Sequence, residues 1–117
     1  ARLANAPAVL AESLLALATA KTQSGDTVGA TSNALEAQKI FSSAGRHDCE
    51  WLAWLVAARA SKASGDDAKA RDYASRAQQV FSGLQQQWGN DYYNTYLSRP
   101  DVQLSRKQLD EIVSGKT

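Results

Sequence analysis

The chain has 117 residues, 13 Lys and Arg against 12 Asp and Glu, and 44% hydrophobic residues, which suits one folded domain and excludes a disordered chain. Its 21 alanines and two prolines favour helices over strands. The near-neutral charge excludes a broad basic field for nucleic acid, no apolar run reaches the roughly 18 residues that span a membrane, and one cysteine excludes an internal disulfide.

The first half of the chain predicts two helices. Pro7 fits the first turn of a helix that runs to about Ser24. A second helix is predicted over residues 27–44, and Gly45 ends it.

The next part of the chain predicts a third and a fourth helix. Asp48 fits the N-cap of a third helix that runs to about Ser64. A fourth helix is predicted over residues 67–88, and Gly89 ends it.

The C-terminal segment predicts two short helices. Asn90 or Asp91 fits the cap of a segment over residues 92–98, which Arg99-Pro100 interrupts. Ser105, with a glutamine three residues later, fits a capping box for a last helix that runs to about residue 114.

An internal repeat organises the chain. The triplet Ser-Gly-Asp at residues 24–26 recurs at residues 64–66, and residues 15–42 align with 55–82 without a gap at 12 identities in 28 positions. Composition explains some of the alanine matches, but not the triplet or the shared Gln and Phe-Ser positions. We interpret the pattern as a duplication.

Each copy is predicted to be an antiparallel helical hairpin. After each Gly-Asp, small or apolar residues recur with the spacing of one helical face, at Ala30, Ala34, Ala37, Phe41 and Ala70, Ala74, Ala77, Phe81. Before each Gly-Asp, a second stripe contains Leu14, Leu17, Ala18 and Trp54, Ala57, Ala58. The glycine suits a left-handed position that ends the first helix, and the aspartate can cap the second.

The same positions carry a family resemblance. The second copy reads Trp54, Ala58, Gly65-Asp66, Ala70 and Ala77, and the first reads Leu14, Ala18, Gly25-Asp26, Ala30 and Ala37. Over residues 11–82 this pattern resembles the tetratricopeptide repeat, although the period of 40 residues exceeds the usual 34 or so. The resemblance implies an all-α fold of antiparallel hairpins stacked as a short α-solenoid. One domain then contains repeat 1 at about 7–44, repeat 2 at about 48–88 and a C-terminal capping segment at about 90–114.

The tail carries a second resemblance. Residues 96–101 read Tyr-Leu-Ser-Arg-Pro-Asp, and residues 88–102 are similar to the closing segment of helical repeat regions in bacterial signalling proteins. This implies that the domain is the C-terminal end of a multidomain regulator.

One cluster of reactive residue types lies at residues 47–50, which read His-Asp-Cys-Glu. Consecutive residues at a helix start fan outward, so we expect Asp48 to cap the helix and Cys49 to be a partly buried small residue. The alternative is a Cys-His nucleophile built on His47 and Cys49, which predicts an acidic thiol. We expect no catalytic residues, no metal site and no cofactor.

Nucleic-acid binding is not predicted either, because basic and acidic residues alternate along the chain. A helix-turn-helix DNA reader stays as an alternative. The closing Gly-Lys-Thr at residues 115–117 lacks the upstream glycine and the strand-helix context of a phosphate-binding loop.

Aromatic residues gather in the second half of the chain, at Trp51, Trp54, Phe81, Trp88, Tyr92, Tyr93 and Tyr96. A terminal repeat needs a cover for its outer face, so we expect these rings to form a capping core, with tyrosine hydroxyls at its wet rim. The alternative is that they line a ligand pocket.

The resemblance implies a function as a non-catalytic protein–protein interaction scaffold, with the first helix of each hairpin lining a groove. The implied groove residues are Glu12, Leu15, Thr19, Thr22, Leu52, Leu55, Arg59 and Lys62. Aliphatic surface and a cationic end near Arg59 and Lys62 predict a peptide or protein partner with an acidic residue or a C-terminal carboxylate.

The alternative function is self-association, or spacing of an attached effector domain. The N-terminal helix carries an apolar face at Leu3, Leu10, Leu14 and Leu17. An uncovered apolar face tends to pair with another copy, so this alternative predicts a homodimer through the N-terminal helix.

Overall fold

The computed structural model describes the backbone of residues 2–114 and the side chains of residue 7 and residues 9–114. These residues form helices and no strand, which confirms the all-α prediction. The helices are α1 (Arg2–Ser24), α2 (Thr27–Ser43), α3 (His47–Ala63), α4 (Asp67–Trp88), α5 (Asn90–Leu97) and α6 (Pro100–Val113).

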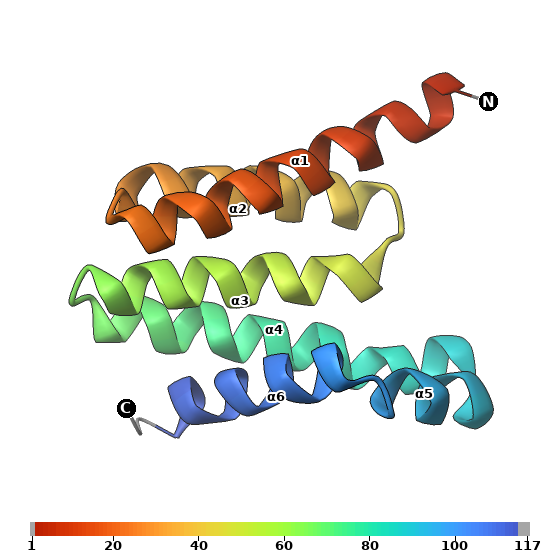
Figure 1. Cartoon of the computed structure of the whole chain (residues 1–117). Coiled ribbons are helices and arrows are strands. Elements are labelled where there is room, and N and C mark those ends of the chain that lie inside the picture. The colour runs from red at the N-terminus through yellow and green to blue at the C-terminus, as the bar shows by residue number, and fades with distance from the viewer. Residues whose placement is uncertain (1, 115–117) are drawn as a thin grey trace.

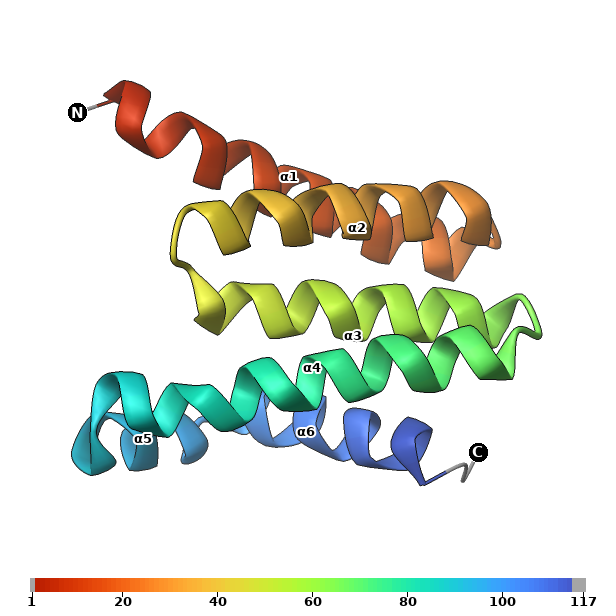
Figure 2. The ribbon, with the colours of Figure 1, turned by 180° about the vertical axis from the view of Figure 1, so that it is seen from behind.

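The helices pack in chain order as two hairpins and a C-terminal cover (Figure 1). α1 pairs with α2, α2 packs on α3, and α3 pairs with α4. α5 and α6 then pack on α4, and α6 also touches α3. α1 and α6 lie on the near side of the stack in Figure 1, whereas α2 and α4 lie on the near side in Figure 2.

The two Gly-Asp turns have the predicted geometry. Gly25 and Gly65 have φ of 95° and 88°, in the left-handed region where a side chain with a Cβ is disfavoured. Asp26 and Asp66 each accept a hydrogen bond at 3.1 Å from the backbone N–H three residues later. The same turn chemistry therefore closes both hairpins.

Small side chains let the helices approach closely. The alanine stripes of α2 and α4 are buried, together with the phenylalanine that ends each stripe. Ala34 and Ala57 share a cluster between the hairpins, and Ala37 and Phe41 share another with Ala53. In α2 and α4 the periodicity thus identifies the buried faces correctly. In α1 the predicted stripe is only partly buried, because Ala18 is core, Leu14 is half-buried and Leu17 is 45% exposed.

Two predicted helix starts in the first three helices are wrong. α1 begins at Arg2 and contains Pro7, because the alanine-rich segment before the proline favours a helix. α3 begins at His47, and Arg46 is its N-cap residue without a side-chain cap hydrogen bond. Asp48 is not the cap, because it lies in the first turn and pairs with Arg46.

The C-terminal helix starts also differ from the prediction. The N-cap of α5 is Gly89 rather than Asn90 or Asp91. α6 begins at Pro100 rather than after Ser105, because proline is pre-organised for the first position of a helix. That preference outweighs the capping-box pattern.

The aromatic cluster forms a core under the C-terminal cover, as predicted. Trp51 and Phe81 are buried with edge-to-face rings 4.8 Å apart, in one cluster with Tyr96, Val102 and further residues of α6. The hydroxyl of Tyr96 does not lie at a solvent-exposed rim as predicted. It forms hydrogen bonds with the Trp51 indole and the backbone carbonyl of Asp48, both in α3. Tyr92 lies outside the core and is exposed.

Candidate functional site

The implied groove residues come from α1 and α3, which touch one another along the stack. α6 touches α3 on the same side as α1 (Figure 1). We call this surface the α1–α3–α6 face.

In α3, Leu52 and Arg59 belong to this face. They are seven residues apart, so they lie on one side of the helix. Leu52 is half-buried against the core cluster and lines a pocket together with residues of α5 and α6. This contact fixes which side of α3 faces α6.

The cationic end of this face is predicted at Arg59 and Lys62. Arg59 and Lys62 are partly exposed, and neither forms an ion pair with a residue that the structure describes. The four ion pairs among the described side chains involve other residues.

Leu55 does not contribute to this surface. Only 3% of it is exposed, and it packs with Trp51 and Ala58 in the core cluster. Its counterpart in the first copy, Leu15, is only half-buried. The sequence pattern treats the two positions as equal, whereas α4 and α6 both pack on α3 and enclose the second one.

The implied groove residues of α1 include two threonines and one glutamate. Thr19 and Thr22 donate their hydroxyl hydrogen bonds to backbone carbonyls one turn earlier, at 3.0 and 2.8 Å. Glu12 is exposed, and its negative charge contributes to the raised pKa of Arg46. Glu12 therefore lies toward the helix start of α3, and the positive charge of the face lies toward its end.

A pocket of about 240 Å³ lies where α3 begins, between that helix and the α5–α6 turn. It is lined by Arg46, Asp48, Cys49, Leu52, Tyr96, Arg99, Asp101, Val102 and Ser105. Leu52 is the residue that the pocket shares with the predicted groove. The pocket therefore extends the α1–α3–α6 face at its N-terminal end.

Each arginine of the pocket is paired with the aspartate two residues later. Arg46 Nε donates to Asp48 Oδ1 at 3.3 Å, and this bond is the main reason for the raised pKa of Arg46. Arg99 donates two hydrogen bonds to Asp101, at 3.1 and 2.7 Å, which lower the pKa of that carboxyl. The pocket therefore offers both signs of charge rather than a purely anionic or cationic lining.

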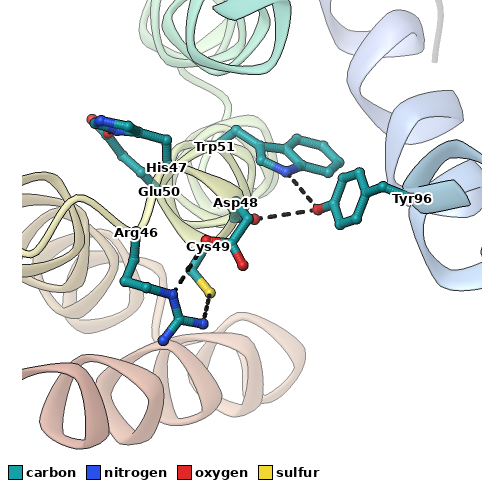
Figure 3. A network of polar contacts seen from close by, with 7 residues as sticks. All are labelled: Arg46, His47, Asp48, Cys49, Glu50, Trp51 and Tyr96. Atoms are coloured by element: carbon teal, nitrogen blue, oxygen red, sulfur yellow. Dashed lines mark hydrogen bonds and ion pairs between the residues drawn. The ribbon is translucent and has the colours of Figure 1, made fainter. Parts of the chain in front are cut away.

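Tyr96 lines the pocket, and its hydroxyl contacts residues at the start of α3 (Figure 3). Its hydroxyl accepts a hydrogen bond from Trp51 Nε1 at 2.9 Å and donates to the backbone carbonyl of Asp48 at 3.3 Å. Burial raises the pKa of Tyr96. These bonds tie α5 to the start of α3.

His47 and Cys49 do not form a nucleophile–base pair, because they point to different sides of the start of α3 (Figure 3). His47 Nδ1 lies 2.8 Å from Glu50, whose other oxygen accepts a hydrogen bond from Gln38 of α2 at 2.8 Å. Cys49 Sγ accepts from Arg46 at 3.3 Å.

The pKa of the Cys49 thiol is raised rather than lowered. Burial is the largest cause of its raised pKa, and Asp48 adds to the effect, while Arg46 opposes it. A Cys-His nucleophile requires the opposite shift, to a lower thiol pKa. Among the described residues, no three His, Cys, Asp or Glu side chains are grouped as a metal site.

Comparisons with protein-family models, curated proteins and solved structures found no match for the chain. The resemblance to tetratricopeptide repeats therefore rests on the residue pattern alone. No helix in the part of the chain that the structure describes is long and apolar enough to cross a membrane.

The pocket was missed at the sequence level, although a signal for it exists. Residues 46–48 and 99–101 both read Arg-x-Asp. The first segment lies at the start of α3 and the second at the start of α6, and these two helices are in contact. The spacing of 53 residues does not follow the 40-residue repeat, so periodicity alone does not connect the two segments.

Proposed function

We propose that the chain is a non-catalytic protein–protein interaction scaffold whose α1–α3–α6 face binds a peptide with an acidic side chain or a C-terminal carboxylate. The observation that carries the proposal is the pair Arg59 and Lys62, which are partly exposed and form no ion pair with a described residue. Guanidinium and ammonium groups donate strong hydrogen bonds to carboxylates. The resemblance of the tail supports a place in a larger bacterial regulator.

The face also offers apolar area for the rest of a peptide. Leu15 and Leu52 are both half-buried, so part of each side chain is open to a partner. Ten helical residues separate Leu52 from Lys62, a distance of about 15 Å along α3. An extended peptide covers that length with about four or five residues.

The pocket at the start of α3 suits a neutral polar group of the same peptide. Its two arginines are each matched by an aspartate, so an added charge gains no net attraction there, while hydrogen-bond donors and acceptors are both available. A carboxylate is therefore expected at Arg59 and Lys62 and not in the pocket.

The test uses an acidic peptide selected by display against the whole chain. The double variant Arg59→Ala/Lys62→Ala is expected to weaken its binding about tenfold, with a weaker salt dependence because two charges are lost. The matched control is Lys69→Ala/Arg71→Ala, which removes the same charge from exposed positions of α4.

Unchanged affinity in the Arg59/Lys62 variant, or an equal loss in the α4 control, contradicts the proposed site. A C-terminally amidated version of the peptide separates the two forms of the ligand. Loss of binding on amidation identifies the terminal carboxylate, and retention identifies an acidic side chain.

A further inference from the structure

The outer side of α1 carries an exposed apolar stripe. Leu10 and Leu17 are 51% and 45% exposed, and the adjacent Leu14 is half-buried. Ser13 and Ala20 complete the same side of the helix and are exposed. We call these five residues the α1 stripe.

The second hairpin shows how the chain treats the equivalent surface. Forty residues later, Glu50, Ala53, Ala57 and Ala60 occupy the positions of Leu10, Ser13, Leu17 and Ala20, and all four are buried. α2 provides the cover, because its alanines and Phe41 pack on α3. The α1 stripe is thus the same helix surface, and none of the described helices covers it in this way.

The chemistry of the stripe differs from that of its buried counterpart. In α3 the position of Leu10 is filled by Glu50, whose carboxylate requires Gln38 of α2 as a hydrogen-bond donor. The α1 stripe contains no charged residue and needs no such donor. A wholly apolar helix surface can therefore cover it.

An uncharged stripe can pair with an identical stripe, because the pairing brings no like charges together. Head-to-tail stacking of copies is blocked, since α5 and α6 already cover the other end of the stack. The outer residues of α6 are mostly polar, including Arg106, Lys107, Asp110 and Glu111. The contact between copies must then be two-fold.

We propose that the α1 stripe binds the α1 stripe of a second copy, with the two helices antiparallel. In this arrangement Leu10 of one copy faces Leu17 of the other, and Ser13 faces Leu14 near the two-fold axis. Small Ser13 permits close approach of the two helices. The pairing buries Leu10 and Leu17, the two most exposed residues of the stripe that are large and apolar.

This dimer leaves the peptide site accessible. Glu12 and Thr19 each follow a residue of the stripe by two positions, which places them about 200° around the helix. The inference is independent of the proposed peptide binding, and a dimer carries two outward peptide sites.

Light scattering on the whole chain tests the association. The expected mass at about 1 mM chain is twice the chain mass of 12.6 kDa. Leu17→Glu is expected to weaken dimerisation at least tenfold, because the dimer interface then buries one carboxylate from each copy. The control Val28→Glu adds the same charge at an 82% exposed position of α2 and is expected to leave the dimer intact.

Cross-linking tests the antiparallel register. In a Cys49→Ser background, a mixture of Leu10→Cys and Leu17→Cys chains is expected to form a disulfide dimer faster than either variant alone. A monomer at about 1 mM, or fastest cross-linking of Leu10→Cys with itself, overturns the proposal. The milder pair Leu10→Ala/Leu17→Ala, with helicity measured by circular dichroism, distinguishes loss of the interface from loss of the fold.

Discussion

The two hairpins have the same backbone plan but different neighbours. Both have a left-handed glycine and an aspartate cap at the turn, and both bury an alanine stripe. α3 is covered by α2 on one side and by α4 and α6 on the other, whereas among the described helices α1 contacts α2 and α3 alone. The neighbours, rather than the repeat, therefore decide whether an apolar residue becomes core or exposed surface.

The difference is visible at equivalent positions. Trp51 in the second hairpin is fully buried, and the position 40 residues earlier is Ala11. Leu55 is buried in the core, whereas Leu15 is half-buried. The larger side chains of the second hairpin, Trp51 and Leu55, are enclosed by residues of α4, α5 and α6.

The largest expected effect is at the centre of the second hairpin. Trp51→Ala removes a fully buried ring and leaves the Tyr96 hydroxyl without its donor, so we expect a loss of about 3–5 kcal/mol in the free energy of unfolding. Trp54→Ala, at a half-exposed position of the same helix, is the matched control and is expected to cost less. Urea unfolding followed by circular dichroism measures both. A loss below about 1 kcal/mol for Trp51→Ala contradicts the assigned core.

The turns test what the hairpins share. Gly25→Val and Gly65→Val are each expected to destabilise the chain by roughly 1–2 kcal/mol, because φ is positive and valine is β-branched. A Cβ at either position meets no atom within 4 Å, so the cost comes from the backbone and is expected to be similar in both. Thermal unfolding of the two variants provides the comparison. A neutral Gly65→Val contradicts the role assigned to this turn.

The smallest expected effect has the opposite sign. Gly83 lies inside α4, where a Cβ meets no atom within 4 Å, and the equivalent position in α2 is Ser43. Gly83→Ala is therefore expected to stabilise the chain by up to about 1 kcal/mol. A fall in the midpoint of urea unfolding would show that α4 needs the glycine.

Most of the fold follows from local signals in the sequence. The Gly-Asp turns and the alanine periodicity place α2 and α4 to within a residue, because turn chemistry and helix faces are properties of short segments. The starts of α3 and α6 are harder to predict. In α3, Asp48 pairs with Arg46 instead of capping the helix. In α6, Pro100 takes the first position of the helix, ahead of the predicted cap Ser105.

The candidate site is only partly predictable. Arg59 and Leu52 are implied by the tetratricopeptide resemblance, and their spacing of seven residues places them on one side of α3. The pocket depends on the α5–α6 turn packing against the start of α3, a contact between segments about 50 residues apart. The burial of Leu55 likewise depends on how α4 and α6 cover α3, which no pattern within α3 specifies.

The most direct test of the proposed function is to map a bound acidic peptide by backbone amide chemical shifts. We expect the largest changes at residues 52–62 of α3 and smaller ones at Glu12 and Thr19. Residues of α2 and the outer side of α1 are expected to stay unchanged. Changes centred on Leu10 and Leu17, or on α4, would contradict peptide binding at the α1–α3–α6 face.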